Sequence, residues 1–512
     1  MQLIGNSFGV HKPSLLSSSI SLVVPAIDGP SLVSAPLSLP RPMANLQQGE
    51  QGPAVGALQN QLIQLGFLFG VVDEDFGPAT AQAVRDFQRR VPLRPDAIVG
   101  SRTAAALSQA LGSSPPFPTS PFRQLRQDAA ASGANDDKLP GLDRGFNTSP
   151  FQDQLPGFAN ALSATPDAVT TLSYPVSPAT FQPYPTIGQI PQVLEGRDGR
   201  GGLEFLSDEV AQACVAVGGF QQGSPLRVRW YGRQASGLNV QFWSATKFAA
   251  ALQLICQANR LQPTLPIDRC DVVGERSGAS RRESFGDLFT EMVSYSKGVP
   301  HSNAVAWMLK QIRSPGQPDL QSWLRSITGN AALRLNGPYG EGAYLIGARL
   351  VGPAGILVPH LDLERTRNIL SAYDLTRLLT MLGWHRHLST DQQLPGAQWS
   401  SLTTAIRSLA HDTARYVDIA IERLGLINQV QAPVVLSKLG FGTTAPGFPE
   451  APALTYAAFA QFIDTRSTPG RQRSVALVLR IPTGQGDGPR HDARMATEVT
   501  EILRRLFAEE FR

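Results

Sequence analysis

The sequence predicts an α+β protein in which an antiparallel sheet is flanked by an all-helical lobe and preceded by a small three-helix domain. Residues 201–512 have strand-like runs at both ends and a long helical middle, the order expected when both ends complete one sheet. Residues 49–111 instead hold three short helical patterns. A chain of 512 residues is also too long for one core, so several domains are expected.

Composition excludes several classes of protein. The net charge of +4 is small for this length, and no basic run carries interleaved aromatics, so a nucleic-acid partner is not expected. No apolar run reaches transmembrane length, so no integral membrane segment is expected. Cys214, Cys256 and Cys270 have no metal-ligand spacing, and free thiols are favoured over a Cys256–Cys270 pair. We therefore expect neither a metal nor a cofactor.

Residues 1–47 are rich in Ser, Pro and Leu and hold almost no charge. Within them, Ser14–Ala26 loosely resembles the apolar core of an export signal, behind His11 and Lys12. Two interpretations stay open, a disordered tail and an export segment, and these residues alone favour the tail.

Residues 48–112 predict a small helical domain. Val55, Leu58, Leu62 and Leu65 recur at helical spacing, a second helix follows Thr80, and a third ends at Leu107. The order V-x-x-L-Q, F-G-x-x-T-x-x-A-V-x-x-F-Q and D-A-I-V-G-x-x-T resembles the peptidoglycan-binding domain of cell-wall enzymes. This resemblance implies peptidoglycan as a partner, and export to the periplasm or cell wall. The matching residues are Val55, Leu58, Gln59, Phe76, Gly77, Thr80, Ala83, Val84, Phe87, Gln88, Asp96, Gly100 and Thr103.

Residues 113–200 predict a Pro/Ser-rich linker, because prolines punctuate the segment and no helical or alternating stripe persists. In residues 201–512 we expect a helix at 203–217, paired strands at 225–234 and 239–243, and a helix from Ser244. Further helices are expected at 285–294, 302–312, 372–384 and 399–409. Strands at 433–442, 456–463 and 473–481 and a helix at 493–511 complete the predicted domain.

The helix from Ser244 has an unusual composition. From Phe248 to Cys256 nearly every side chain is apolar, which predicts burial on all sides. Ser244 and Lys247 are costly there unless they pair or do chemistry, and their spacing puts them on one face. Burial favours the neutral Lys247 amine, which can accept the Ser244 proton, and the unpaired N–H groups of the helix start can bind an oxyanion.

The S-A-T-K run at this junction, in this order of elements, resembles the serine β-lactamase and penicillin-binding D,D-peptidase superfamily over residues 203–512. Ser244 and Lys247 match its S-x-x-K nucleophile and base. Lys438-Leu-Gly440 takes the place of K-T-G. The resemblance implies that the Lys438 ammonium lies near the nucleophile and favours a substrate carboxylate. It also implies that the Phe441 N–H joins that of Ser244 in an oxyanion hole.

The middle motif of the family is interrupted, because Lys297–Ser302 looks inserted where S-D-N should be contiguous. Ser296, Ser302 or His301 would then relay the proton to the leaving group. Asn303 would supply the amide that contacts the substrate.

Other features limit or compete with this interpretation. A second S-x-x-K at Ser294–Lys297 is followed at once by Gly298 and Pro300, so it cannot open a buried helix. Glu364 lies in roughly the region of the family's deacylating glutamate but lacks the flanking E-x-x-L-N, so efficient β-lactam hydrolysis is not implied. His385-Arg-His387 has no acidic partner for a metal site. Gly337–Gly342 predicts a loop near the rim of the active site.

Together these features predict a cell-wall-associated serine hydrolase of the β-lactamase or D-Ala-D-Ala carboxypeptidase type. It would act through an acyl-enzyme on peptidoglycan stem peptides or β-lactams. The alternative is a catalytically degenerate peptidoglycan-binding protein that retains the fold. The interrupted motif supports that alternative, as does Leu439, which replaces a family Thr or Ser.

Overall fold

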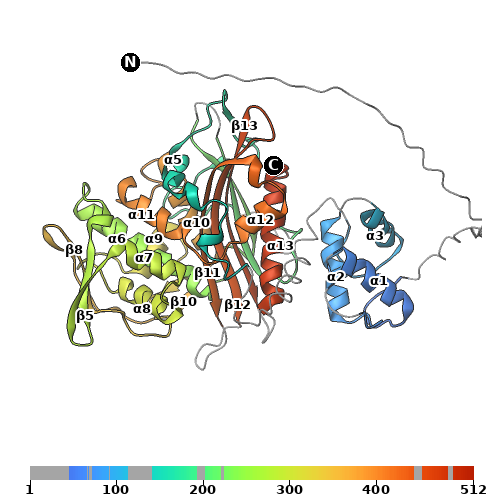
Figure 1. Cartoon of the computed structure of the whole chain (residues 1–512), viewed down its shortest axis with the longest axis horizontal. Helices are drawn as coiled ribbons and strands as arrows, with labels where there is room; N and C mark the ends of the chain where they lie inside the picture. Colours follow the sequence, from blue (N-terminus) through green and yellow to red (C-terminus); the bar gives the residue numbers. More distant parts are fainter. Residues whose placement is uncertain are drawn as a thin grey trace, which may run out of the picture. The chain divides into compact units, whose positions relative to one another are not determined.

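The computed structural model describes residues 45–112 except 66, 69–71 and 92, and residues 141–192, 202–220, 224–442, 452–482 and 488–511. Figure 1 shows the whole chain. The expectations for residues 1–44, including the apolar run Ser14–Ala26, and for linker residues 113–140 lie outside the described residues.

The small domain has the three predicted helices, α1 (Pro53–Gln64), α2 (Pro78–Arg90) and α3 (Ser101–Gly112). Their shared core is built from fully or almost fully buried side chains at the apolar motif positions. These include Val55, Leu58, Phe76, Val84 and Phe87.

The polar motif positions of this domain form two matching hydrogen-bonded clasps. Gln59 Nε2 donates to Thr80 Oγ1 at 3.1 Å and to a backbone carbonyl of the preceding loop. Gln88 Nε2 repeats this pattern with Thr103 Oγ1 at 3.2 Å. Each buried glutamine amide therefore ties one helix to the start of the next, which explains why these positions are polar within a small core.

The C-terminal domain is built on one large sheet with the strand order β11-β12-β13-β3-β4-β2. The strands span Val430–Gly442 (β11), Ala453–Asp464 (β12), Gly470–Pro482 (β13), Gln212–Gly219 (β3), Arg227–Arg233 (β4) and Gln182–Pro183 (β2). Neighbours along this order pair antiparallel, while β1 (Thr171–Leu172) pairs parallel with β13. The predicted sheet completed by both ends of the domain is confirmed, and β11 lies at its edge.

Both faces of this sheet are buried, in two separate cores. Tyr456 and Ala458 of β12 belong to the core beneath α13 (Gly488–Phe507) and α12 (Tyr416–Arg423), whereas Ala457 and Phe459 belong to the core shared with the helical lobe. Figure 1 shows α12 and α13 beside the sheet and the lobe on its other side. Successive side chains of a strand point to opposite faces. Because both faces are buried here, the sequences of these strands are apolar almost without interruption.

The helical lobe packs around α6 (Phe248–Leu261), in which all but the last two residues are buried. Its other helices are α7 (Phe285–Ser294), α8 (Val299–Lys310), α9 (Leu320–Thr328), α10 (Ala372–Gly383) and α11 (Trp399–Ala410). The predicted burial of the helix after Ser244 agrees with the structure. No helix in the described ranges has the length and apolar content needed to cross a membrane.

The lobe also carries strands that the sequence did not predict. A four-stranded sheet has the order β6-β5-β8-β9, with β5 at Asp271–Arg276, β6 at Ala279–Ser284, β8 at Ile346–Gly352 and β9 at Gly355–Val358. Figure 1 shows this sheet on the side of the lobe away from the main sheet. Two further short strands, β7 (Arg334–Leu335) and β10 (Asn368–Ile369), pair antiparallel with each other.

Three segments differ from the sequence predictions. The helix expected at 203–217 is strand β3 at its C-terminal end, because a run buried on both faces carries no period that separates strand from helix. The strand expected at 239–243 is reduced to one bridge, Val240 with Leu370. Residues 141–192, assigned to the linker, hold η1 (Phe146–Thr148), η2 (Gln152–Gly157), α5 (Phe158–Ser163), β1 and β2. Phe158, Leu162 and Tyr184 of this segment are buried in the core of the helical lobe.

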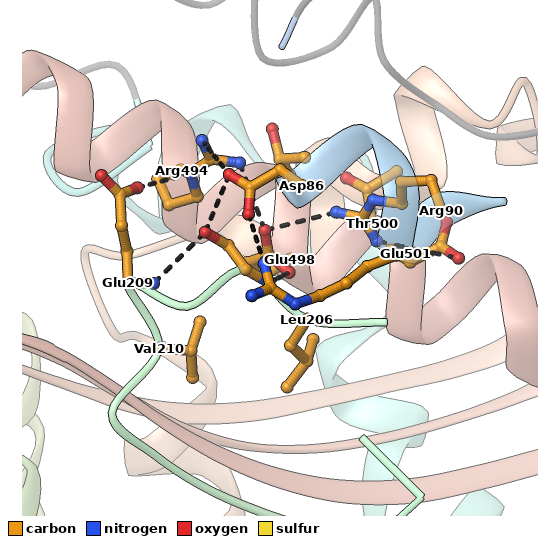
Figure 2. A network of polar contacts seen from close by, with 12 residues as sticks. Asp86, Arg90, Leu206, Glu209, Val210, Arg494, Glu498, Thr500 and Glu501 are labelled. Carbon is orange, nitrogen blue, oxygen red and sulfur yellow. Dashed lines mark hydrogen bonds and ion pairs between the residues drawn. The ribbon is translucent and has the colours of Figure 1, made fainter. Parts of the chain in front are cut away.

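Helices α2 and α13 carry buried charged side chains that pair with each other (Figure 2). The Asp86 carboxylate accepts a hydrogen bond from Ser207 Oγ at 3.0 Å and pairs with Arg494 at 3.1 Å. Arg90 pairs with Glu498 at 3.3 Å. Because a buried charge is costly without a partner, these ion pairs account for acidic and basic residues on otherwise covered helix faces.

Candidate active site

Ser244 lies in a tight turn directly before α6. The turn is a 3₁₀ helix, Trp243–Thr246, and α6 begins at Phe248, so Ser244 precedes the α-helix by one turn instead of opening it. Trp243 has a φ of 50°, a left-handed conformation that is uncommon for a residue with a side chain. Such backbone strain persists only where the surroundings hold it, and it concentrates at functional sites.

Lys247 is fully buried one turn after Ser244. Its Nζ donates to Ser302 Oγ at 2.9 Å and to Asn303 Oδ1 at 2.5 Å, both on α8. Within the described residues no carboxylate forms an ion pair with it. Burial, with repulsion from Lys438 second, lowers the pKa of Lys247 to about 6, while the Glu341 carboxylate acts to raise it. A neutral amine is therefore the main form of Lys247 at pH 7.

The hydroxyl of Ser244 forms no hydrogen bond with Lys247 in this structure, although the spacing predicted that the amine can reach it. The Lys247 side chain is instead turned toward α8, where Ser302 and Asn303 supply two acceptors. Ser244 itself is 8% exposed, so the residue is largely covered.

Lys438 reaches the same place from the edge strand β11. Its Nζ lies 3.8 Å from the centroid of the Tyr295 ring, and the Lys247 Nζ lies 5.2 Å from that centroid. Lys438 Nζ also donates to Val293 O at 3.2 Å and lies 3.6 Å from Asp412 Oδ1. The structure thus brings the two lysines, 191 positions apart in the sequence (438 − 247), around one aromatic ring.

Gly440 allows β11 to approach the Ser244 turn. A Cβ atom at this position would lie 2.4 Å from Phe242 O, 2.4 Å from Thr455 Oγ1 and 2.7 Å from Ala245 N. Real Cβ atoms do not come that close to backbone, so a side chain would push the strand and the turn apart. Only glycine, which has no Cβ atom, therefore fits at this position of the K-L-G run.

The main chain of β11 offers a donor at its open edge. Tyr295 OH donates to the Leu439 carbonyl at 3.5 Å, so the main-chain polar groups of Leu439 point away from β12. In an antiparallel strand this direction alternates from residue to residue. The N–H of Phe441, two residues on, accordingly faces the same open edge. The Leu439 side chain packs into the core beneath α13.

The three candidates for the proton relay lie in different surroundings. Ser296 is exposed, and none of its hydrogen bonds reaches either lysine. His301 Nε2 lies 2.9 Å from a Glu291 carboxylate oxygen, and its ring packs on Tyr344. Ser302 is fully buried, accepts from Lys247 and donates to Met292 O at 2.7 Å. Of the three, Ser302 alone contacts a site lysine.

Sequence reasoning missed several residues that surround these lysines. Tyr295 lies between them, Asp412 faces Lys438, and Glu341 with Tyr339 approaches Lys247 from the Gly337–Gly342 loop. That loop was predicted at the rim, and its acidic residue was the available signal. No pattern in the sequence points to Asp412, because its relation to Lys438 exists only in the folded chain.

Comparison with known proteins assigns the small domain. A family model described as a putative peptidoglycan binding domain matches residues 51–107. The chain is also 38% identical over 106 residues to the "Uncharacterized protein in bpoA1 3'region" of Kitasatospora aureofaciens, covering 20% of this chain and 81% of that protein. At this identity and coverage, the chain belongs to the same family as that protein, whose name states no activity.

Solved structures similar to the chain are β-lactamases. A β-lactamase from Sphaerobacter thermophilus is 12% identical, covers 60% of this chain and 94% of its own, and has a TM-score of 0.34. The TLA-3 extended-spectrum β-lactamase is 13% identical, covers 59% and 96%, and has a TM-score of 0.35. At these identities and TM-scores, no residue's role follows from the likeness. The roles proposed below therefore depend on contacts within this chain.

Proposed function

We propose that the C-terminal domain is a serine acyl-transfer enzyme held at the cell wall by the peptidoglycan-binding domain. Its substrates would be peptidoglycan stem peptides, or β-lactams that mimic them, and it would act outside the cytoplasm. The observation that carries this proposal is Lys247, a fully buried lysine with uncharged hydrogen-bond partners, one turn from a serine. A neutral amine in that position is suited to accept a hydroxyl proton.

In the first step Ser244 Oγ attacks the substrate carbonyl carbon, and its proton passes to the Lys247 amine. The new oxyanion is held by the backbone N–H groups of Ser244 and Phe441. The carbon–nitrogen bond then breaks, and the leaving nitrogen takes the proton from Lys247. Water or an amine attacks the resulting ester, which releases the acyl group and restores the Ser244 hydroxyl.

The other site residues support these steps. Lys438 attracts a substrate carboxylate, and Gly440 keeps β11 against the nucleophile turn. Ser302 and Asn303 hold the Lys247 amine, and the Ser302 hydroxyl offers a route for its proton because it is hydrogen-bonded to that amine. The Asn303 amide would contact the substrate. Ser296 and His301 are weaker candidates for this relay, since one is exposed and the other is bonded to Glu291.

One observation favours a second candidate function, a peptidoglycan-binding protein whose hydrolase-like domain does not catalyse. The Lys247 amine forms no hydrogen bond with the Ser244 hydroxyl and is instead bound to Ser302 and Asn303 of α8. Acylation of Ser244 decides between the two candidates.

A fluorescent penicillin that labels nucleophilic serines tests the proposal. We expect the full-length protein to be labelled, Ser244→Ala to lose the label, and Lys247→Met to lose roughly 100-fold or more in labelling rate. Ser400→Ala is the matched control, because Ser400 is an exposed serine of α11 with no role in the proposed reaction, and it should label like the wild type. Labelling of Ser244→Ala at the wild-type level would remove the proposal. A wild type that is inert to acylating probes yet pellets with sacculi would favour the second candidate.

A further inference from the structure

Lys310 is a buried lysine that the reaction above does not use. It ends α8 and is 1% exposed. Its Nζ donates to Gly337 O at 2.9 Å and to Asn368 Oδ1 at 2.9 Å, and no carboxylate pairs with it in the described part of the chain. Burial lowers the pKa of Lys310 well below its ordinary value. A neutral amine has two N–H groups, and here each of them has an acceptor.

Asn368, one of the two residues that Lys310 binds, is also hydrogen-bonded to the backbone of the other, Gly337, and to that of Pro338. The Gly337 N–H donates to Asn368 Oδ1 at 3.0 Å, and Asn368 Nδ2 donates to Gly337 O at 3.1 Å and Pro338 O at 2.9 Å. A Cβ atom on Gly337 would lie 2.6 Å from Thr366 O, so the backbone is also enclosed sterically. Lys310 and Asn368 therefore fix the start of the Gly337–Gly342 loop.

Tyr339, in the same loop, connects the loop to the turn that holds Ser244. The Tyr339 ring lies 4.3 Å from Lys310 Nζ and 5.4 Å from Lys247 Nζ. Its hydroxyl forms a 2.8 Å hydrogen bond with Thr246 Oγ1, and Thr246 Oγ1 donates to Trp243 O at 2.9 Å. Trp243 and Thr246 flank Ser244 in its turn. A continuous set of contacts thus runs from Lys310 to the turn.

We propose that Lys310 is a positioning residue for acylation of Ser244, an inference that rests on the proposed function. By clasping Gly337 it fixes Tyr339 against Thr246, and it keeps Glu341 where its charge acts on Lys247. Helix α8 then supports the site at both ends. Ser302 and Asn303 hold Lys247 directly, and Lys310 holds the loop that covers it.

The test compares Lys310→Met with Gln253→Met in the full-length protein. Methionine keeps the length of the lysine side chain but removes both donors. Gln253 is a matched control because it is also buried in the lobe and donates to a backbone carbonyl, Pro318 O at 2.8 Å, in a loop outside the site. For each variant we would measure the melting temperature and the rate of Ser244 acylation by a fluorescent penicillin from pH 5 to 9.

We expect both variants to lose similar thermal stability. Only Lys310→Met should lose about 10- to 100-fold in acylation rate at high pH, the cost of a nucleophile displaced by about 1 Å. Its rate should also stay high to lower pH than in the wild type, because displacing Glu341 removes an influence that raises the pKa of Lys247, and this influence is larger than the opposing one of Lys310 itself. Tyr339→Phe should lower the rate as well, and its effect should not add to that of Lys310→Met, because both break one chain of contacts.

Equal acylation by Lys310→Met and Gln253→Met, or additive effects of Lys310→Met and Tyr339→Phe, would overturn this inference alone. A wild type that is never acylated at Ser244 would remove the proposed function, and this inference with it.

Discussion

Lys247 carries a proton in an unfolded chain at neutral pH, whereas burial in this fold lowers its pKa to about 6. Repulsion from Lys438 acts in the same direction. The Glu341 carboxylate opposes both, so its presence sets how far the pKa of Lys247 falls. Lys310 also acts to lower it, so the proton affinity of Lys247 depends on residues that lie far apart in the sequence.

The substitution Glu341→Gln tests this balance of charges. Removing the carboxylate removes an influence that raises the pKa of Lys247, so the pKa should fall further. The rise of acylation rate with pH should then move to lower pH, and at pH 5 the variant should be acylated faster than the wild type. Glu364→Gln, which removes an exposed carboxylate of the same lobe, should leave the profile unchanged. A shift of the Glu341→Gln profile to higher pH would contradict the assignment.

Among the individual residues of the candidate site, those that belong to short sequence motifs were predictable. Those that lie near the lysines only in the folded chain were missed. Ser244 and Lys247 are detectable because a polar pair in a wholly apolar helix is costly without a purpose. Lys438 is detectable through its glycine neighbour, Gly440. Tyr295 and Asp412 carry no comparable signal, because their relation to the lysines appears only when α7 and the segment before α12 pack beside β11.

Among the elements, edge strand β11 and the turn Trp243–Thr246 depend on each other. The strand lies against the turn at Gly440, and the Thr455 hydroxyl of β12 lies 2.9 Å from both Gly440 O and Phe242 O, between which its single proton is shared. This three-way contact fixes where the open edge of β11 passes the turn that holds Ser244.

The substitution Gly440→Ala should separate these two elements. A methyl group there meets two backbone atoms and Thr455 Oγ1 at 2.4–2.7 Å, so we expect about 1–3 kcal/mol of destabilisation and loss of Ser244 labelling. Gly237→Ala is the control, because a Cβ atom at Gly237 meets nothing within 4 Å. Denaturant unfolding and the labelling rate would be compared. Wild-type labelling by Gly440→Ala would contradict the close approach.

Element boundaries were predictable where flanking residues or periodicity marked them. Helix α7 runs from Phe285 to Ser294 as predicted, because Ser284 caps it and Tyr295 ends it in a left-handed conformation. Strand β3 was mistaken for a helix, since an apolar run buried on both faces has no period. The sheet of β5, β6, β8 and β9 was missed because β6 is largely exposed with few apolar residues, and β9 has only four residues, two of them exposed.

In the whole molecule a peptidoglycan-binding domain and the proposed acyl-transfer site occur in one chain. The small domain was predictable because its core and its glutamine clasps follow a fixed order of residues. The extent of the linker was not, because the prolines of residues 141–192 occupy loops, the 3₁₀ helix η2 and the edge strand β2, where they are compatible with folded structure. The burial of Phe158, Leu162 and Tyr184 against the lobe depends on partners far away in the sequence.

The substitution Phe87→Ala in the full-length protein should separate wall binding from acylation. Phe87 is fully buried, and truncating such a side chain costs about 3–5 kcal/mol, a large share of the stability of so small a domain. We expect pelleting with peptidoglycan sacculi to fall sharply while penicillin labelling in solution persists. Arg102→Ala, at an exposed position of α3, should leave both unchanged. Undiminished pelleting by Phe87→Ala would contradict the assignment of wall binding to this domain.

The rate of Ser244 acylation as a function of pH tests the central claim most directly, namely that a neutral Lys247 activates the serine. The adduct would be located on the Ser244 peptide by mass spectrometry, and its rate of formation followed from pH 4 to 9. Because the base must be unprotonated, the account predicts a rate that rises tenfold per pH unit at low pH and levels off above an apparent pKa of about 6. A rate that keeps rising toward the ordinary lysine pKa near 10, or an adduct on another residue, would contradict it.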